Sequence, residues 1–89
     1  MATMFVRHKV SDFAKWKAVY DDFRPTQKRL GVTADSVYRG EDDPSDVTVA
    51  HEFQTLAAAK TFVASDELHA AMKNAGVAGE PTIWFASKA

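Results

Sequence analysis

Length, composition and charge describe one ordinary globular domain and exclude several classes of protein. The chain has 89 residues, of which 46% are hydrophobic and 26% charged, so we expect a single folded domain over residues 1–89. Eleven Lys and Arg residues balance twelve Asp and Glu residues, which argues against a nucleic-acid partner, and the lack of cysteine excludes disulfides, thiolate metal sites and cysteine nucleophiles. No apolar run reaches the ~20 residues of a membrane span, so we expect no membrane partner and a cytoplasmic location.

The first third of the chain predicts a strand followed by a long helix. Apolar and polar residues alternate from Met4 to Val10, which is typical of a strand, and the apolar face would carry Met4, Val6, His8 and Val10. Ser11 is the predicted N-cap of a helix that runs to about Leu30. Pro25 should kink this helix or end its regular part, because it lacks a backbone N–H. One apolar stripe follows the helical spacing: Phe13, Trp16, Tyr20, Phe23, Gln27 and Leu30.

The middle of the chain predicts a hairpin. A strand is expected from Ala34 to Arg39, and a second from Val47 to Phe53. The polar loop 40–46 between them contains four acidic residues at a spacing that does not match a calcium loop, and we interpret it as a solvated hairpin loop. Alternation in the second strand places Val47, Val49, His51 and Phe53 on one face.

The last third predicts two short helices and a final strand. The first helix starts near Thr55, and Ser65 caps the second, which Gly76 closes. Residues 77–80 are interpreted as a loop, and the apolar stretch 81–86 as the last strand.

This order of elements predicts an α+β fold of the ferredoxin-like βαββαβ type, with an antiparallel-type sheet covered by helices on one face. We expect the strand order 4-1-3-2, with the first and third strands as central neighbours that run parallel. The other sheet face would hold large apolar groups beside charged ones: Phe5, Ala50 and Trp84 with Arg7, Lys9 and Glu52. Such a face is typical of burial against a second sheet, which predicts a homodimer. The opposite assignment of faces stays open, although it would turn four valines away from the helices.

His8 and His51 are the sharpest candidates for chemistry. Both lie on the apolar faces of predicted central strands, so their imidazoles would share one side of the sheet and could be close together. An imidazole titrates near neutrality and suits proton transfer, and burial would lower its pKa, as would a second imidazole nearby. The alternative is two structural histidines that hydrogen bond to backbone or a tyrosine hydroxyl. Two histidines without a carboxylate on their face are too few for a metal site, so no metal is expected.

Further candidates come from the helices. Trp16, Tyr20 and Phe23 could form the wall of an aromatic pocket, with Gln27 where the core could open, although all could equally fill a core. His69 could reach into that pocket if its helix covers it.

Four runs of residues resemble a known family: RHKVSDFAKWK (7–17), VYRGEDDP (37–44), AHEF (50–53) and AGVAGEPTIWF (75–85). They are similar to the small dimeric α+β barrel proteins, in the cyclase-like group related to antibiotic biosynthesis monooxygenases. The resemblance implies a homodimer with its sheets packed face to face and a pocket between sheet and helices in each subunit. It also implies a small cofactor-independent enzyme, monooxygenase- or cyclase-like, acting on an aromatic or polyketide-like molecule. The alternatives are a non-catalytic ligand-binding or stress-associated dimer and a structural subunit whose pocket is filled.

Overall fold

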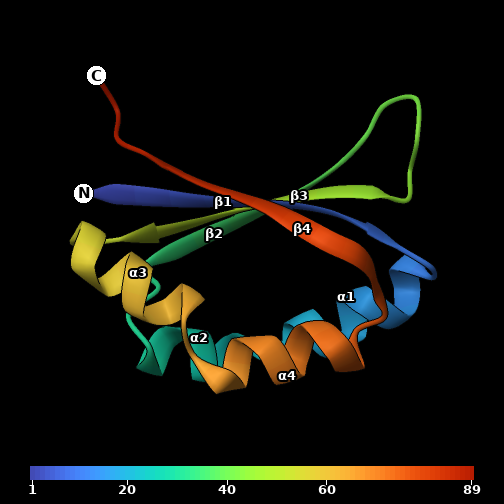
Figure 1. Cartoon of the computed structure of the whole chain (residues 1–89), viewed down its shortest axis with the longest axis horizontal. Coiled ribbons are helices and arrows are strands. Elements are labelled where there is room, and N and C mark those ends of the chain that lie inside the picture. Colours follow the sequence, from blue (N-terminus) through green and yellow to red (C-terminus); the bar gives the residue numbers. More distant parts are fainter.

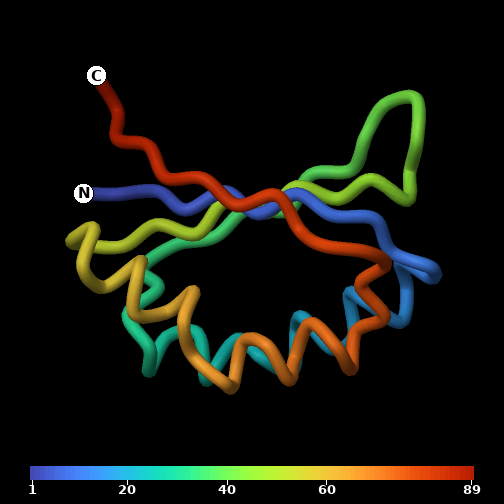
Figure 2. The backbone as a smooth tube through the Cα atoms, viewed as in Figure 1, coloured from blue at the N-terminus to red at the C-terminus, as the bar shows by residue number.

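Four antiparallel strands form one sheet, and four helices cover one of its faces (Figure 1). The computed structural model describes residues 1–89. Its elements are β1 (Ala2–Val10), α1 (Phe13–Asp22), α2 (Arg24–Arg29), β2 (Ala34–Arg39), β3 (Asp46–Phe53), α3 (Leu56–Val63), α4 (Asp66–Asn74) and β4 (Val77–Ala86). The backbone trace in Figure 2 shows the helical layer beneath the sheet, with the β2–β3 loop extending away from the helices.

The strand order β2-β3-β1-β4 confirms the predicted order, but the expected parallel pairing of the first and third strands is wrong. β1 pairs with β3 and with β4 in antiparallel registers. The physical reason is that β2 and β3 form a hairpin. The helices between β1 and β2 return the chain so that β2 runs parallel to β1, and β3, which lies between these two strands, runs in the opposite direction.

The alternation of the strands decides which side chains meet the helices. On β1 the residues Ala2, Met4, Val6, His8 and Val10 are buried, and on β3 the residues Val47, Val49, His51 and Phe53 are buried. The predicted inner faces of both strands are therefore confirmed, and both histidines point into the layer between sheet and helices.

The first helical segment is broken into two helices at Phe23. Pro25 lies in the first turn of α2, where its missing N–H costs nothing, so the predicted effect of the proline is confirmed. The N-cap prediction is wrong by one residue: Asp12, not Ser11, has extended backbone and accepts the Lys15 N–H at 3.3 Å. A carboxylate at this position also suits the positive end of the helix.

The last strand starts earlier than predicted. Residues 77–80 belong to β4, because Val77 pairs with Val10 and Ala78 with Lys9. A register shift between Arg7 and Lys9 of β1, together with the positive φ of 73° at Gly79, allows the first residues of β4 to pair with β1. A bulge of this kind breaks the alternation that would have marked the strand in the sequence.

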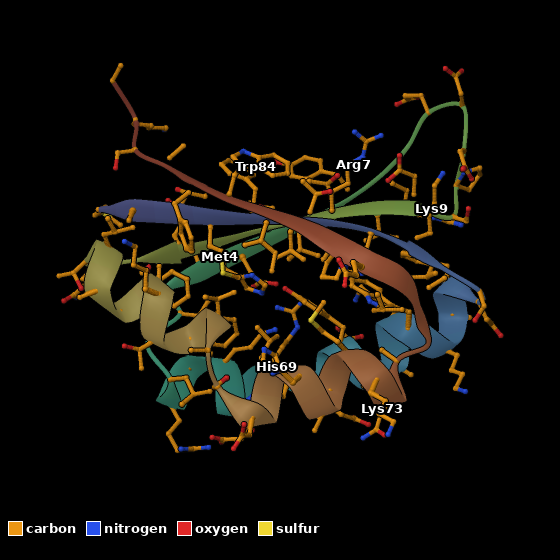
Figure 3. All side chains as sticks on the ribbon, in the orientation of Figure 1. Met4, Arg7, Lys9, His69, Lys73 and Trp84 are labelled. Carbon is orange, nitrogen blue, oxygen red and sulfur yellow. The ribbon has the colours of Figure 1, made fainter.

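The outer sheet face stays uncovered in the single chain. Phe5 and Trp84 stack on it with ring centroids 5.3 Å apart, and Trp84 keeps 40% of its surface exposed. Figure 3 shows Trp84 and Arg7 on this side, away from the helices. Ion pairs also hold the β2–β3 hairpin to β1, which the sequence did not predict: Asp46, the first residue of β3, pairs with Arg7 at 2.6 Å, and Asp43 in the loop pairs with Lys9.

None of the helices combines the length and apolar character that crossing a membrane would require.

Candidate functional site

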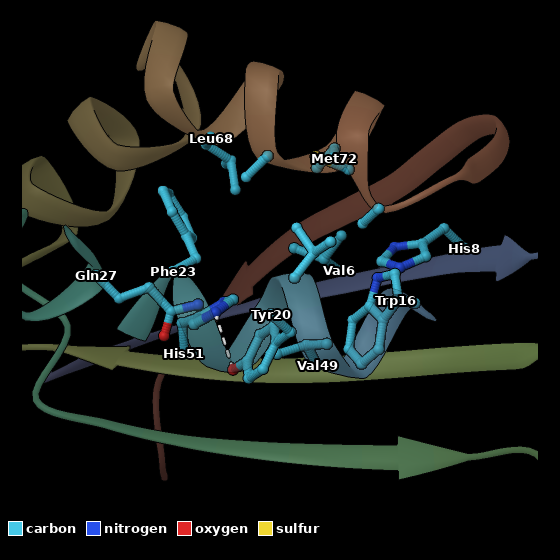
Figure 4. A pocket seen from close by; sticks show the side chains of 13 residues that line it. Val6, His8, Trp16, Tyr20, Phe23, Gln27, Val49, His51, Leu68 and Met72 are labelled. Atoms are coloured by element: carbon cyan, nitrogen blue, oxygen red, sulfur yellow. Dashed lines mark hydrogen bonds between the residues drawn. The ribbon is translucent and has the colours of Figure 1, made fainter. Parts of the chain in front are cut away.

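A narrow apolar cavity lies between the inner sheet face and the helices (Figure 4). The volume of the cavity is about 40 Å³, so it is a slot rather than a wide chamber. The cavity is lined by Val6, His8, Trp16, Val19, Tyr20, Phe23, Gln27, Val49, His51, Leu68, Ala71, Met72 and Ala75.

The cavity brings together six of the seven site residues predicted from the sequence. His8 comes from β1 and His51 from β3, while α1 supplies Trp16 and Tyr20. Phe23 lies at the break between α1 and α2, and Gln27 follows on α2, where it is buried. The remaining lining comes mostly from valines of the sheet and from α4, whose Leu68 and Met72 lie across the slot (Figure 4).

His69 lies outside this cavity, so the expectation that it reaches in from α4 is not met. It is exposed, and its Nε2 lies 3.1 Å from the Val63 carbonyl oxygen, to which it donates. Leu68, the residue before it, takes the inward position on the face of α4 that also carries Met72, and the turn of about 100° per residue places His69 to the side of that face.

The two buried imidazoles lie at opposite ends of the slot, which corrects the expectation of a close pair. His8 faces Val47 in the antiparallel register, four residues from His51 along β3. At about 3.3 Å per residue this spacing is roughly 13 Å. The imidazoles therefore share a face and a cavity, but neither influences the titration of the other.

An aromatic row connects the two ends. The rings of His8 and Trp16 lie 5.7 Å apart, Trp16 stacks on Tyr20 at 5.0 Å, and the rings of Tyr20 and His51 lie 6.1 Å apart. These flat walls favour a flat, apolar occupant, because aromatic faces gain contact area and stacking energy against another ring.

His51 forms the more polar end of the slot. It is only 3% exposed, and its Nε2 lies 3.4 Å from the Tyr20 hydroxyl oxygen, while its Nδ1 has no hydrogen-bond partner in the chain. Burial lowers the pKa of His51 from 6.5 to about 4, against an opposing effect of the Asp35 carboxylate. The ring is therefore neutral at physiological pH.

The Tyr20 hydroxyl is held by a partner that sequence reasoning missed. It donates to Asp35 Oδ2 at 2.5 Å, and Arg24 Nη1 donates to Asp35 Oδ1 at 2.8 Å. Burial and the Asp35 carboxylate raise the pKa of Tyr20 far above its ordinary value, so this hydroxyl keeps its proton. A signal was present in the sequence, because a hairpin centred on the loop 40–46 places Asp35 opposite His51.

His8 forms the other end. It is 7% exposed, and neither ring nitrogen has a hydrogen-bond partner in the chain. Burial lowers the pKa of His8, and the Asp46 carboxylate opposes that shift. A buried imidazole with both nitrogens unpartnered in the chain is costly, and a water molecule or a ligand in the slot would offset that cost.

No group of three or more His, Asp or Glu side chains lies close enough together to hold a metal ion. The chemistry that the slot itself can offer is proton exchange and hydrogen bonding by two neutral imidazoles, in walls that are mostly apolar and include the buried Gln27.

Comparison with solved structures finds the same fold over almost the whole chain. A structure from Bordetella bronchiseptica described as "Putative antibiotic biosynthesis monooxygenase" matches with a TM-score of 0.86 and 18% identity, covering 99% of this chain and 96% of that one. The chain has the fold of the antibiotic biosynthesis monooxygenases. SnoaB from Streptomyces nogalater, a cofactor-independent oxygenase, shares this monooxygenase fold with a TM-score of 0.76 and 15% identity, covering 99% of this chain and 94% of that one.

A third structure with the monooxygenase fold, from Caulobacter crescentus CB15 and described in the same words as the Bordetella protein, matches with a TM-score of 0.78 and 19% identity over 99% of this chain and 89% of that one. No family model matches the sequence, and no curated protein matches it by sequence. These solved structures thus support, at the level of the fold, the resemblance of the sequence to the antibiotic biosynthesis monooxygenase group.

Proposed function

We propose that the protein is a small cofactor-independent enzyme, monooxygenase- or cyclase-like, that acts on an aromatic or polyketide-like molecule bound in the slot. The observation that carries the proposal is a pair of buried imidazoles with three ring nitrogens unpartnered in the chain, namely both nitrogens of His8 and Nδ1 of His51, in a mostly apolar, aromatic-walled cavity. Burying such groups without partners is unfavourable, and a ligand that hydrogen bonds to them would offset that cost. The fold shared with SnoaB adds support.

His51 and His8 serve as proton acceptors or polarising groups in this proposal. A neutral imidazole takes a proton from a substrate hydroxyl or activated C–H, which leaves an imidazolium and a substrate anion. The low pKa of His51 makes it a weak base, so the substrate must form a well-delocalised anion, as phenols and β-dicarbonyl units do. That anion can attack a carbonyl in a cyclisation or react with molecular oxygen in an oxygenation.

The proposal also includes a homodimer. The uncovered outer face combines the Phe5–Trp84 stack with the paired charges of Arg7 and Asp46. A second copy of the sheet packed on this face would remove the exposed aromatic surface from water.

The test compares turnover by the wild type and by the His8→Gln/His51→Gln double variant on hydroxylated polycyclic phenols and poly-β-ketone analogues. Oxygen uptake and mass spectrometry of the products distinguish oxygenation from cyclisation. We expect the double variant to lose at least about 100-fold in kcat, because a positioned acid or base contributes 10²–10⁴-fold. The exposed His69→Gln variant is the matched control. Turnover that persists unchanged in the double variant would contradict the assigned roles.

A further inference from the structure

Four side chains from four elements form one hydrogen-bonded series that ends at the slot. Arg24 on α2 donates to Asp35 on β2, Tyr20 on α1 donates to the other oxygen of Asp35, and His51 on β3 lies beside the Tyr20 oxygen. The N–O distance in the first contact is 2.8 Å, the O–O distance in the second is 2.5 Å and the N–O distance in the third is 3.4 Å. Figure 4 shows the last of these contacts between Tyr20 and His51.

The direction of each hydrogen bond follows from counting protons. Asp35 is ion-paired with Arg24 and is a carboxylate, so it can only accept. The Tyr20 hydroxyl therefore donates its single proton to Asp35. The Tyr20 oxygen can then only accept from His51, which requires the proton of the neutral imidazole to be on Nε2.

We propose that Asp35 is a positioning residue that acts through Tyr20 to hold His51 as the Nε2–H tautomer, which leaves Nδ1 as the lone-pair nitrogen offered to a ligand. The tautomer is a property of the free protein, and only the role of Nδ1 toward a ligand rests on the proposed function. His51 Nδ1 is buried and has no partner in the chain, as an acceptor reserved for an incoming donor would be.

The surroundings of His51 contain no competing ionisable group. Asp35 and Arg24 are the only charges that influence its titration. From α3 the ring of Phe62 packs on His51 at 5.3 Å, and from α4 the slot receives apolar side chains only, while Met4 faces His51 from β1. Tyr20 is thus the side chain within hydrogen-bond distance of the His51 ring, and Asp35 is the acceptor that orients the Tyr20 hydroxyl.

The proposal restricts the chemistry of the ligand at this end of the slot. A lone-pair nitrogen accepts a hydrogen bond, so the group that meets His51 is a donor such as a neutral hydroxyl. Arg24 is engaged by Asp35 and Asp21 and does not line the slot, so a carboxylate at this position would find no cation.

The experiment is ¹⁵N NMR of the histidine side chains in the full chain, because the shifts of the two ring nitrogens report the tautomer directly. In the ligand-free wild type at neutral pH we expect a protonated, pyrrole-type Nε2 and a pyridine-type Nδ1 for His51. A pyridine-type Nε2 would overturn the proposal, and this measurement requires no variant to fold.

The Asp35→Asn variant tests the cause. Arg24 would hold the amide oxygen of Asn, so the amide NH₂ would face Tyr20, whose hydroxyl would then turn its proton toward His51 Nε2. We expect the two nitrogens of His51 to exchange their shift types. Asp21→Asn is the control, because the Asp21 side chain also binds Arg24 but hydrogen bonds to neither Tyr20 nor His51. This variant should leave the tautomer of His51 unchanged. An unchanged tautomer in Asp35→Asn would overturn the role of Asp35.

Titration with phenol separates this proposal from the proposed function. A phenol-dependent shift of His51 Nδ1 that anisole, its O-methyl ether, does not produce would support the donor requirement. An equal shift with anisole would overturn that requirement. Phenol and anisole both failing to bind would count against the proposed function and against the ligand role of Nδ1, while the tautomer measured without ligand would still decide the role of Asp35.

Discussion

His51 is kept neutral by its surroundings, and this has a consequence for stability as well as for chemistry. Its pKa falls from 6.5 in an exposed chain to about 4 in the fold, chiefly through burial. A group with a lowered pKa binds its proton more readily in the unfolded chain. The contribution of His51 to stability is therefore complete above pH 6.5 and is lost as the pH falls toward 4.

The pH dependence of unfolding measures this effect. Between pH 6.5 and 4 we expect the free energy of unfolding to decrease by about 3 kcal/mol through His51, with a further decrease in the same direction from His8. Urea unfolding at a series of pH values gives the slope. His51→Gln should flatten it and exposed His69→Gln should not. Equal slopes in His51→Gln and the wild type would show that His51 titrates normally in the fold.

Residue patterns in the sequence predicted the two buried histidines but neither their separation nor the hydrogen-bonded neighbours of His51. Alternation alone places His8 and His51 on the inner faces, because the period of a strand fixes the face of each residue. Their separation depends on the register and direction of β1 against β3, which alternation does not determine. The role of Asp35 was missed for the same reason, because it depends on which residue of β3 lies opposite Asp35 in the paired strands.

At the scale of elements, the junction between α3 and α4 depends on one hydroxyl. Ser65 Oγ accepts the Leu68 N–H at 3.2 Å and donates to the Phe62 carbonyl at 2.7 Å, so it caps α4 and closes the end of α3. Both neighbours are buried, Leu68 against the slot and Phe62 in the core.

Ser65→Ala should lower the free energy of unfolding by about 1 kcal/mol, as the loss of an N-cap typically does. Chemical denaturation measures the difference, and Ser36→Ala on the exposed side of β2 is the matched control. Because α4 supplies one wall of the slot, ligand affinity should also decrease in Ser65→Ala. A variant as stable as the wild type would show that the cap contributes nothing.

Element boundaries were predictable where a local signal exists. Pro25, Thr55 and Ser65 mark their helices correctly, because a missing N–H and a capping oxygen act within one turn. The start of β4 at Val77 was missed because residues 77–80 show no alternation, and their strand geometry is imposed by pairing with β1 across a bulge.

At the scale of the whole molecule, the uncovered sheet face predicts self-association. Trp84 is 40% exposed and stacks on Phe5 on that face. We expect the wild type to have a mass in solution of twice 9.8 kDa. Trp84→Glu would place a charge in the buried interface and should yield a folded monomer.

Light scattering coupled to gel filtration measures the masses of both proteins. Ala14→Glu introduces the same carboxylate on the exposed surface of α1 and should remain a dimer. A wild type that is monomeric at every concentration would contradict the dimer, and a dimeric Trp84→Glu variant would place the interface elsewhere.

The overall architecture was the most predictable feature. The order of elements and the two-faced strands define the ferredoxin-like plan, and structures 15% to 19% identical to this chain share it. Such low identity is physically reasonable, because the fold requires the apolar pattern rather than particular side chains. The side chains that line the slot are individual to each sequence, so the fold alone does not choose the reaction.

The most direct test of the account is a crystal structure of the protein grown with phenol. We expect the phenol ring in the slot between Trp16, Tyr20 and α4, with its hydroxyl within hydrogen-bond distance of His51 Nδ1. A slot closed by its own side chains, with phenol absent or bound only elsewhere, would contradict the assignment of this cavity as the functional site.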